Sequence, residues 1–228
     1  MNTLTVYQLP HSPFCLPVTR ALEALGVPFA VHNVPNSDRT KIIELTGGRC
    51  YQVPLMVHDG ACVFDGSEGS PDGQDLPRYI DRSWGHGSLF PTRFEGVQEI
   101  LLHHLENEVE LVTFKLTDIH YVASINDIVE RTMVLRHKER RFGRGCISAW
   151  SNSRDQLWAQ AVQLLRPYDR MVEQNHFLLG EAPMYVDFAL YGLLANLAYN
   201  NWNPLPPLPY LQAWYGRIQQ FHFPQITA

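Results

Sequence analysis

Residues 4–18 constrain the fold more than any other part of the sequence. They read as a short apolar strand, a turn and the start of a helix. Pro10 ends the strand, and Pro13 suits the first helical position, where its missing N–H removes no hydrogen bond. Ser12 then lies at or next to the N-cap. Because a helix N-terminus stabilises an anion or a thiolate, this stretch predicts a thiol-handling site.

The following residues extend this stretch to a β-α-β unit. The first helix continues over 19–25 and ends at a glycine, and a second strand is expected over 29–34. Two strands joined by one helix are expected to lie parallel in one sheet. A short helix comes next over 37–45, with Ser37 as its cap and Ile43 partly buried.

A hairpin completes the predicted sheet. The apolar runs over 51–58 and 61–64 flank an Asp-Gly pair, which is a strong hairpin signal. Pro54 opens a strand rather than interrupting one, a position compatible with a cis peptide at a site. A last helix is expected over 76–82. The order β-α-β-α-β-β-α predicts one small α+β domain.

The second half of the chain is helical by pattern. Residues 83–91 are loop-like, and no convincing strand follows them. Apolar residues at helical spacing predict helices over 91–120, 126–144, 154–174, 186–199 and 210–221. We therefore predict an α+β domain over 1–82, a linker over 83–90 and an all-α helical bundle over 91–228.

Composition and charge exclude several classes of protein. The 23 acidic and 18 basic residues are interspersed, with a net charge of −5, so no nucleic-acid partner is expected. No apolar run reaches ~18 residues and no secretion signal precedes the first strand, so no membrane contact is expected and the cytoplasm is the default. The four cysteines form no C-x-x-C pair, and the His and Glu residues over 103–108 do not share a helix face. No metal site is expected.

Together these features resemble the cytosolic glutathione transferases. The resemblance rests on SPF at the first helix, Val-Pro before the third strand, an acidic turn after the fourth, and FLLGEAPMYVDFALYGLL in the helical half. It covers nearly the whole chain. It implies a thioredoxin-like domain that binds glutathione as co-substrate and an all-helical domain that binds the second substrate. It also implies a cytoplasmic homodimer that acts in detoxification.

The resemblance assigns the catalytic role to Ser12. The Ser12 hydroxyl would donate a hydrogen bond to the glutathione thiolate and, with the helix terminus, lower the thiol pKa. Phe14 and Cys15 of the same motif are expected to contact glutathione. The sequence SPFC is also similar to the CPFC of glutaredoxins. Cys15 is therefore either a small buried hydrophobe or a thiol that exchanges disulfides with glutathione.

The resemblance also implies which residues bind the cysteinyl and glycine parts of glutathione. Val53 and Pro54 match the Val–cis-Pro pair of the family, whose valine backbone pairs with the cysteinyl moiety like an added strand. Either Gln52 or Arg49 would bind the glycine carboxylate.

The acidic turn departs from the family pattern. Asp65 would hold the γ-glutamyl end of glutathione together with either Gly66 or Ser67, because a glycine splits the usual adjacent pair. In the helical half, Met184 stands where family members have a capping hydroxyl, so Asp187 is expected to cap the buried helix by itself.

The leading hypothesis is a glutathione transferase that directs the activated thiol at a hydrophobic electrophilic small molecule. One alternative is a glutathione-dependent thiol-disulfide reductase that uses Cys15. Another is a non-catalytic binding or assembly module, which the split acidic turn favours.

Overall fold

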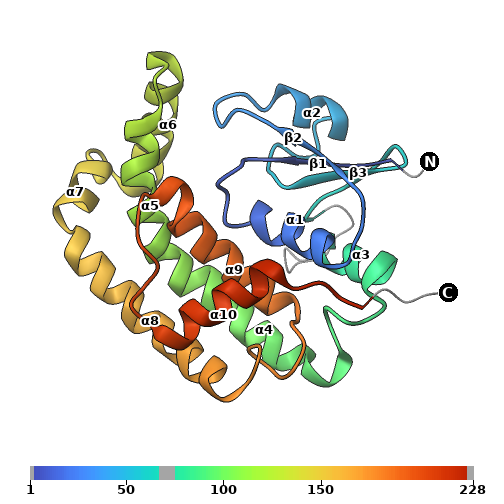
Figure 1. Cartoon of the computed structure of the whole chain (residues 1–228). Coiled ribbons are helices and arrows are strands. Elements are labelled where there is room, and N and C mark those ends of the chain that lie inside the picture. The colour runs from blue at the N-terminus through green and yellow to red at the C-terminus, as the bar shows by residue number, and fades with distance from the viewer. Residues whose placement is uncertain (1–2, 67–74, 225–228) are drawn as a thin grey trace.

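The computed structural model describes residues 3–66 and 75–224 of the 228-residue chain. An α/β part comes first and a helical part follows, and the two pack side by side (Figure 1). This confirms the predicted fold class. One continuous apolar core joins the two parts, since Val6 and Leu22 belong to the same buried cluster as Phe188 and Trp214.

The sheet is small and mixed, with the strand order β2-β1-β3-β4. Its strands are β1 (Leu4–Gln8), β2 (Ala30–Asn33), β3 (Leu55–His58) and β4 (Ala61–Val63). The pairing of β1 with β2 is parallel, as a β-α-β unit requires, and β3 is antiparallel to both β1 and β4. Asp59 and Gly60 both have positive φ, at 48° and 83°, which confirms the tight hairpin turn between β3 and β4.

In the described residues, the helices of the α/β part are α1 (Cys15–Ala24), α2 (Thr40–Thr46) and α3 (Asp75–Ile80). The prediction that Pro13 begins α1 is wrong, because Phe14 is the N-cap. The Ser12 carbonyl accepts the N–H groups of Cys15 and Leu16 at 3.1 Å, so Ser12–Phe14 form the turn that starts the helix.

The start of α2 also differs from the prediction. Ser37 is not its cap, since the carboxylate of Asp38 accepts the Thr40 N–H at 2.9 Å and the helix begins at Thr40. Ile43 is 45% exposed rather than partly buried. The helix ends at Gly47, in the left-handed conformation with φ 61°, as the glycine pair predicts.

The connection to the helical part contains more helix than expected. A π-helical turn over Asp81–Gly85 continues α3 into residues that sequence pattern assigns to a loop. The Asp81 carboxylate accepts the N–H groups of Leu89 at 3.0 Å and Phe90 at 3.2 Å. These two hydrogen bonds give the backbone N–H groups of the connection an acceptor, although the connection contains no strand.

The helical part follows the predicted pattern closely. Its helices are α4 (Glu95–His104), α5 (Glu110–Ser124), α6 (Ile128–Phe142), α7 (Cys146–Asn152), α8 (Arg154–Gln174), α9 (Tyr185–Leu197) and α10 (Pro209–Gln220). A π-helical turn over Leu105–Val109 joins α4 to α5, so the long predicted helix is continuous but not regular. Sequence reasoning missed α7, which buries only Cys146 and so has little apolar periodicity.

The α9 helix is the buried centre of the helical part, as predicted, and it packs on α1 (Figure 1). Asp187, fully buried in its first turn, accepts the Met184 N–H at 3.0 Å. This confirms that Asp187 caps the helix without help from a hydroxyl. Its carboxylate also accepts the Leu178 N–H at 2.9 Å and the indole N–H of Trp214 at 3.0 Å.

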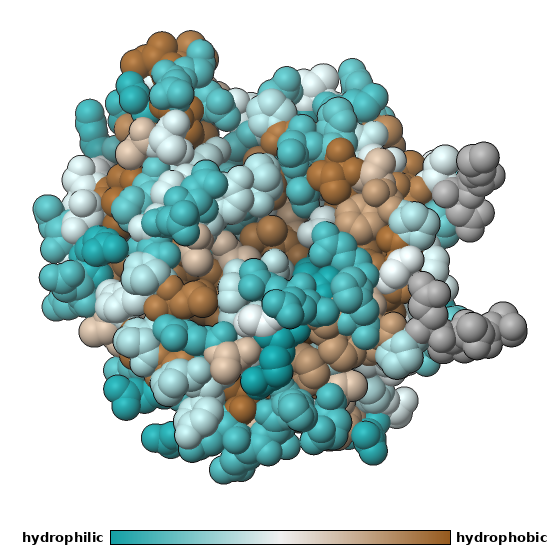
Figure 2. Space-filling model, in the orientation of Figure 1, coloured by the Kyte–Doolittle hydropathy of each residue, from teal (hydrophilic) through white to brown (hydrophobic). Residues whose placement is uncertain are grey.

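Polar residues dominate the face in Figure 2, and one of its brown patches lies at the tip of α6. Ile128, Val129 and Met133 there are 64%, 68% and 52% exposed. Across residues 3–66 and 75–224, none of the helices has the length and apolar character that crossing a bilayer requires.

Candidate functional site

A cleft of about 490 Å³ lies between the α/β part and the helices α5 and α6. The α/β wall includes Ser12, Phe14, Gln52, Val53, Pro54 and Asp65. The structure thus brings together six of the residues singled out from the sequence, although they come from three separate segments. Cys15 and Gly66 are not part of this wall, and Ser67 lies outside the described residues.

Ser12 is 8% exposed and presents its side chain at the start of α1. Its Oγ accepts the backbone N–H groups of Phe14 and Cys15, both at 3.3 Å. A hydroxyl has two acceptor positions and one donor, so these bonds do not use the O–H hydrogen, which can be donated into the cleft or to the Cys15 sulfur beneath it. The site therefore presents a hydrogen-bond donor to the cleft at a helix N-terminus.

Cys15 lies beneath Ser12, fully buried. Burial raises the pKa of the Cys15 thiol to about 11, against an opposing hydrogen bond from Ser12. At neutral pH such a thiol is ionised in about one molecule in 10⁴. This environment suits a small core side chain better than an attacking thiolate.

The Val53-Pro54 peptide bond is cis, as predicted. Val53 precedes β3, and within the described part of the chain its N–H and C=O have no backbone partner. Gln52 is exposed and lines the cleft. Arg49 does not, because its Nε donates to the Thr46 carbonyl at 2.9 Å and its guanidinium lies over the Phe64 ring.

Arg39 lines the cleft, and sequence reasoning missed it. Its Nη2 donates to Asn36 Oδ1 at 3.0 Å, while Nη1 is buried and has no partner among the described residues. Burial lowers the pKa of this guanidinium. A buried donor without an acceptor is unfavourable, so this group fits an anionic ligand. The one feature of the sequence that could have pointed to Arg39 is its positive charge in the polar stretch between β2 and α2.

Asp65 follows β4 and is half-buried. Burial raises the pKa of its carboxyl to about 6, and the Leu76 N–H, 3.2 Å from Oδ1, opposes this shift. The neighbouring Gly66 has φ 79° and donates its N–H to Asp75 Oδ2 at 2.8 Å. Gly66 therefore shapes the turn rather than the cleft wall.

The helical wall of the cleft, opposite Ser12, is charged, whereas a site for a hydrophobic second substrate was expected there. Glu106, Glu110 and Asp118 line it from the long helix, and Lys138 and Arg141 from α6. Asp118 is buried and ion-paired with Lys138. Burial raises the pKa of Glu110 to about 7.

Aromatic rings lie near the turn before Ser12. The His11 ring is 4.2 Å from the Tyr121 ring, and both residues line the cleft. Burial lowers the pKa of His11 to about 4, so this imidazole is neutral at pH 7. The His11 carbonyl accepts Asn196 Nδ2 of α9 at 2.5 Å, which ties the turn to the helical part.

Among residues 3–66 and 75–224, no three His, Cys, Asp or Glu side chains gather closely enough to hold a metal ion. The two histidines over 103–104 have other contacts. His104 Nδ1 lies 2.8 Å from the Tyr168 hydroxyl, and His103 Nδ1 lies 3.2 Å from Asn107 Nδ2.

Comparison with known proteins supports the resemblance seen in the sequence. Residues 151–217 match the model of the family described as "Glutathione S-transferase, C-terminal domain". A glutathione S-transferase of Ceriporiopsis subvermispora in complex with glutathione is similar at 14% identity, over 94% of this chain and 97% of that chain, with a TM-score of 0.73. A theta class glutathione S-transferase of Xanthomonas axonopodis pv. citri with glutathione bound is 18% identical over 100% of both chains, with a TM-score of 0.64.

Glutathione S-transferase 1-6 from Anopheles dirus species B is 14% identical over 94% of this chain and 88% of that chain, with a TM-score of 0.65. At these identities the likenesses show the fold, a small mixed sheet in an α/β domain followed by a helical domain.

Proposed function

We propose that the protein is a glutathione transferase that ionises the glutathione thiol beside Ser12. The observation that carries this proposal is the position of the Ser12 hydroxyl, which lines the cleft at the start of α1 and does not use its hydrogen in its two backbone bonds. A free thiol has a pKa near ~8.5 and is only a few per cent ionised at neutral pH. A hydrogen bond to a charged group is worth about 1.5–3 kcal/mol, which lowers the pKa by about 1–2 units.

The remaining cleft residues match the chemistry of the tripeptide. The unpaired Val53 backbone is available to the cysteinyl part, as in strand addition. Asp65 would pair with the γ-glutamyl ammonium and Arg39 with the glycine carboxylate, helped by Gln52. In this assignment Arg39 takes the place of Arg49 as the cation for the glycine carboxylate, because the Arg49 side chain contacts Thr46 and Phe64. Two similar structures contain bound glutathione, which supports the same ligand for this protein.

The reductase hypothesis has weaker support. Cys15 is buried away from the cleft wall, and burial raises its thiol pKa to about 11. Normal disulfide reduction by a Cys15→Ser variant would remove this hypothesis. A non-catalytic module that has lost the ligand site would instead give no heat with glutathione at millimolar concentration.

The test of the proposed function is Ser12→Ala. The ultraviolet absorbance of the bound thiolate should titrate about 1–2 pH units higher than in the wild type. Conjugation of 1-chloro-2,4-dinitrobenzene below neutral pH should fall by about 10–100-fold. Ser12→Thr keeps the hydroxyl and should retain part of the activity.

The matched control is Ser148→Ala, because Ser148 is exposed on α7 and lies outside the cleft. Circular dichroism and thermal unfolding show whether each variant is folded. An unchanged thiolate titration in folded Ser12→Ala would refute the role of Ser12. The absence of a thiolate band in the wild type would refute the proposed function.

We also propose that the enzyme acts in the cytoplasm as a homodimer in detoxification, as the family resemblance implies. Val97 and Ile100, 39% and 70% exposed on one face of α4, offer apolar surface for a second copy. Light scattering on the purified protein measures its mass, and a monomeric mass would contradict the homodimer.

A further inference from the structure

Asn196 is a buried amide near the end of the helix α9. It is 3% exposed, although the helix around it is mainly apolar. Burying an amide among apolar side chains costs free energy unless its N–H and C=O groups are paired. The hydrogen-bond partners of Asn196 therefore indicate what this residue does.

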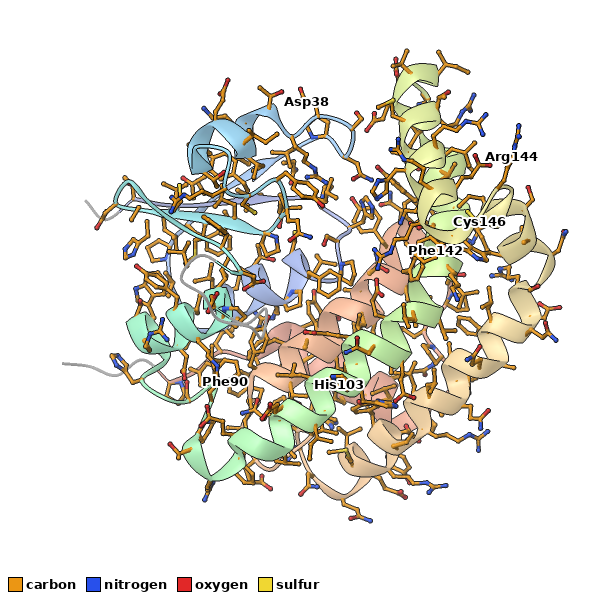
Figure 3. The ribbon with its side chains drawn as sticks, turned by 180° about the vertical axis from the view of Figure 1, so that it is seen from behind. Asp38, Phe90, His103, Phe142, Arg144 and Cys146 are labelled. Atoms are coloured by element: carbon orange, nitrogen blue, oxygen red, sulfur yellow. The ribbon has the colours of Figure 1, made fainter. Side chains whose placement is uncertain are left out.

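Asn196 links α5 to the turn before α1. Its Nδ2 donates to the His11 carbonyl at 2.5 Å, and its Oδ1 accepts the Thr117 hydroxyl at 3.0 Å. Thr117 is 1% exposed and lies on α5, which packs against α9 as α1 does (Figure 3). A carbonyl can only accept a hydrogen bond, so the amide must turn its NH2 group toward His11. The Thr117 donor then fits the oxygen on the other side of the amide.

The His11 carbonyl belongs to the peptide unit that leads into Ser12. The N–H of the same unit is that of Ser12, and it donates to the Leu9 carbonyl at 3.1 Å. One hydrogen bond thus holds this peptide within the turn, and the other ties it to α9. Because a peptide unit is planar, it cannot rotate without weakening at least one of these bonds. Asn196 therefore contributes to the place of the Ser12 side chain.

Gly192 lies one turn before Asn196 on the same face of α9. A Cβ on Gly192 would be 2.5 Å from the Pro13 carbonyl oxygen, so the backbone of α9 approaches the turn closely there. The helix thus presents a small residue to Pro13 and a hydrogen-bond donor to His11. Since these two residues flank Ser12, the place of Ser12 in the cleft depends on α9.

We propose that Asn196 is a positioning residue for thiol activation by Ser12, with its amide oriented by Thr117. The inference rests on the proposed function. Asn196 holds the peptide before Ser12, so that the Ser12 hydroxyl meets the sulfur of glutathione at hydrogen-bond distance. A hydrogen bond weakens steeply as its length and angle depart from their optimum. Without Asn196 the hydroxyl remains, but its bond to the thiolate becomes weaker.

The experiment removes the Asn196 amide and follows the bound thiol. Asn196→Leu has nearly the same size but cannot pair with His11 or Thr117. The ultraviolet absorbance of the bound thiolate should titrate about 0.5–1 pH unit higher than in the wild type, a smaller shift than in Ser12→Ala. Below neutral pH, kcat/KM with 1-chloro-2,4-dinitrobenzene should fall by about 3–10-fold, which is the same shift expressed as the fraction of thiolate.

S-methylglutathione separates this effect from a general loss of structure, because its sulfur cannot ionise. The affinity of Asn196→Leu for this ligand, measured by calorimetry, should stay within about threefold of the wild type. The reason is that Val53, Asp65 and Arg39 of the cleft are unchanged. A purely structural role would weaken this binding and leave the titration of the bound thiol unchanged.

A double mutant shows whether Asn196 acts through Ser12. Asn196 lines the cleft, so a direct contact with glutathione is the competing explanation. In a Ser12→Ala background, Asn196→Leu should shift the thiol titration by no more than about 0.2 pH unit, because the hydroxyl that it positions is gone. A direct contact with the thiolate would instead add its full shift to that of Ser12→Ala.

Thr117→Val tests the same support from a residue outside the cleft. It leaves the Asn196 amide without the donor that orients it, and the bound thiol should titrate about 0.3–0.5 pH unit higher. Thr117→Ser keeps the hydroxyl and should titrate like the wild type. The matched control is Thr113→Val, because Thr113 is also 1% exposed on α5 but donates its hydroxyl to the Val109 carbonyl at 3.1 Å. This control should leave the thiol titration unchanged.

The outcomes distinguish this inference from the proposed function. A wild type without a thiolate band refutes the proposed function, and an unchanged titration in folded Ser12→Ala refutes the role of Ser12. With both of these as expected, a folded Asn196→Leu variant that titrates like the wild type overturns the inference alone. So does a shift that is equally large in the Ser12→Ala background. If Asn196→Leu does not fold, equal titrations for Thr117→Val and Thr113→Val overturn the inference.

Discussion

If Asp65 pairs with the γ-glutamyl ammonium as proposed, glutathione binding should depend on pH. Burial raises the pKa of its carboxyl to about 6. An ammonium group requires the ionised form, so below about pH 6 binding must first remove a proton. The affinity for S-methylglutathione, whose sulfur cannot titrate, should fall by up to about tenfold per pH unit from pH 6 to pH 5. Isothermal calorimetry measures this directly.

Asp65→Asn should bind more weakly at pH 7 and lose most of this pH dependence. The matched control is Asp59→Asn, in the exposed turn between β3 and β4, where asparagine also accepts a positive φ. A pH dependence that survives in Asp65→Asn would show that another group binds the ammonium.

At the scale of single residues, the sequence predicts those functions that belong to local motifs. The roles proposed for Ser12, before a proline at a helix start, and for Asp65, in an acidic turn after a strand, come from the family resemblance that these motifs carry. Arg39 and Glu110 belong to no motif. Only the folded chain shows that they face the cleft, because the packing of β2, α5 and α6 decides which polar side chains meet there.

At the scale of elements, the Asp187 carboxylate forms hydrogen bonds that join the start of α9 to Leu178 and to Trp214 of α10. Asp187→Ala leaves the N–H groups of Leu178, Met184 and Trp214 without their acceptor. Each buried donor without a partner costs about 1–3 kcal/mol, so the free energy of unfolding should fall by at least about 3 kcal/mol. Urea unfolding measures it.

Asp187→Asn keeps one acceptor oxygen and should destabilise the fold by less than Asp187→Ala. Equal free energies of unfolding for the wild type and Asp187→Ala would mean that these hydrogen bonds make no net contribution to stability. The family resemblance predicts this cap, because the aspartate of the family's capping box is retained at the start of the apolar helix. It does not predict the contact with Trp214, which is 27 residues away.

Element boundaries depend on details that pattern alone does not resolve. The helix α2 starts where the Asp38 carboxylate accepts an N–H, although Ser37 next to it is an equally good cap by residue type. In α7, with only Cys146 buried, no apolar repeat was available to predict the helix. The long helix was predicted because its apolar repeat spans many turns, but its π-helical turn was not.

At the scale of the whole molecule, contact between α1 and α9 positions Ser12 relative to the helical wall. A Cβ on Gly192 of α9 would lie 2.5 Å from the Pro13 carbonyl oxygen and would also clash with Pro17. Gly192→Ala must therefore push the turn before α1 away from α9. We expect a loss of about 1–3 kcal/mol in the free energy of unfolding and weaker glutathione binding, measured by urea unfolding and calorimetry.

The matched control is Gly216→Ala in α10, where a Cβ meets nothing within 4 Å. This variant should be at least as stable as the wild type, because alanine favours a helix over glycine by about 1 kcal/mol. Unchanged glutathione binding in Gly192→Ala would show that the two parts adjust without moving Ser12.

The sequence by itself determined the order of the strands and of the helices other than α7, the α/β and helical halves, the cis-proline position and six residues of the α/β wall. These follow from periodicity, turn chemistry and short motifs, which act over a few residues. Only the tertiary structure decided that Cys15 is buried, that Arg39 replaces Arg49 at the cleft and that charged residues line its helical wall. The reason is physical: burial, pKa and the neighbours of a side chain depend on which elements pack together, and no local pattern specifies that packing.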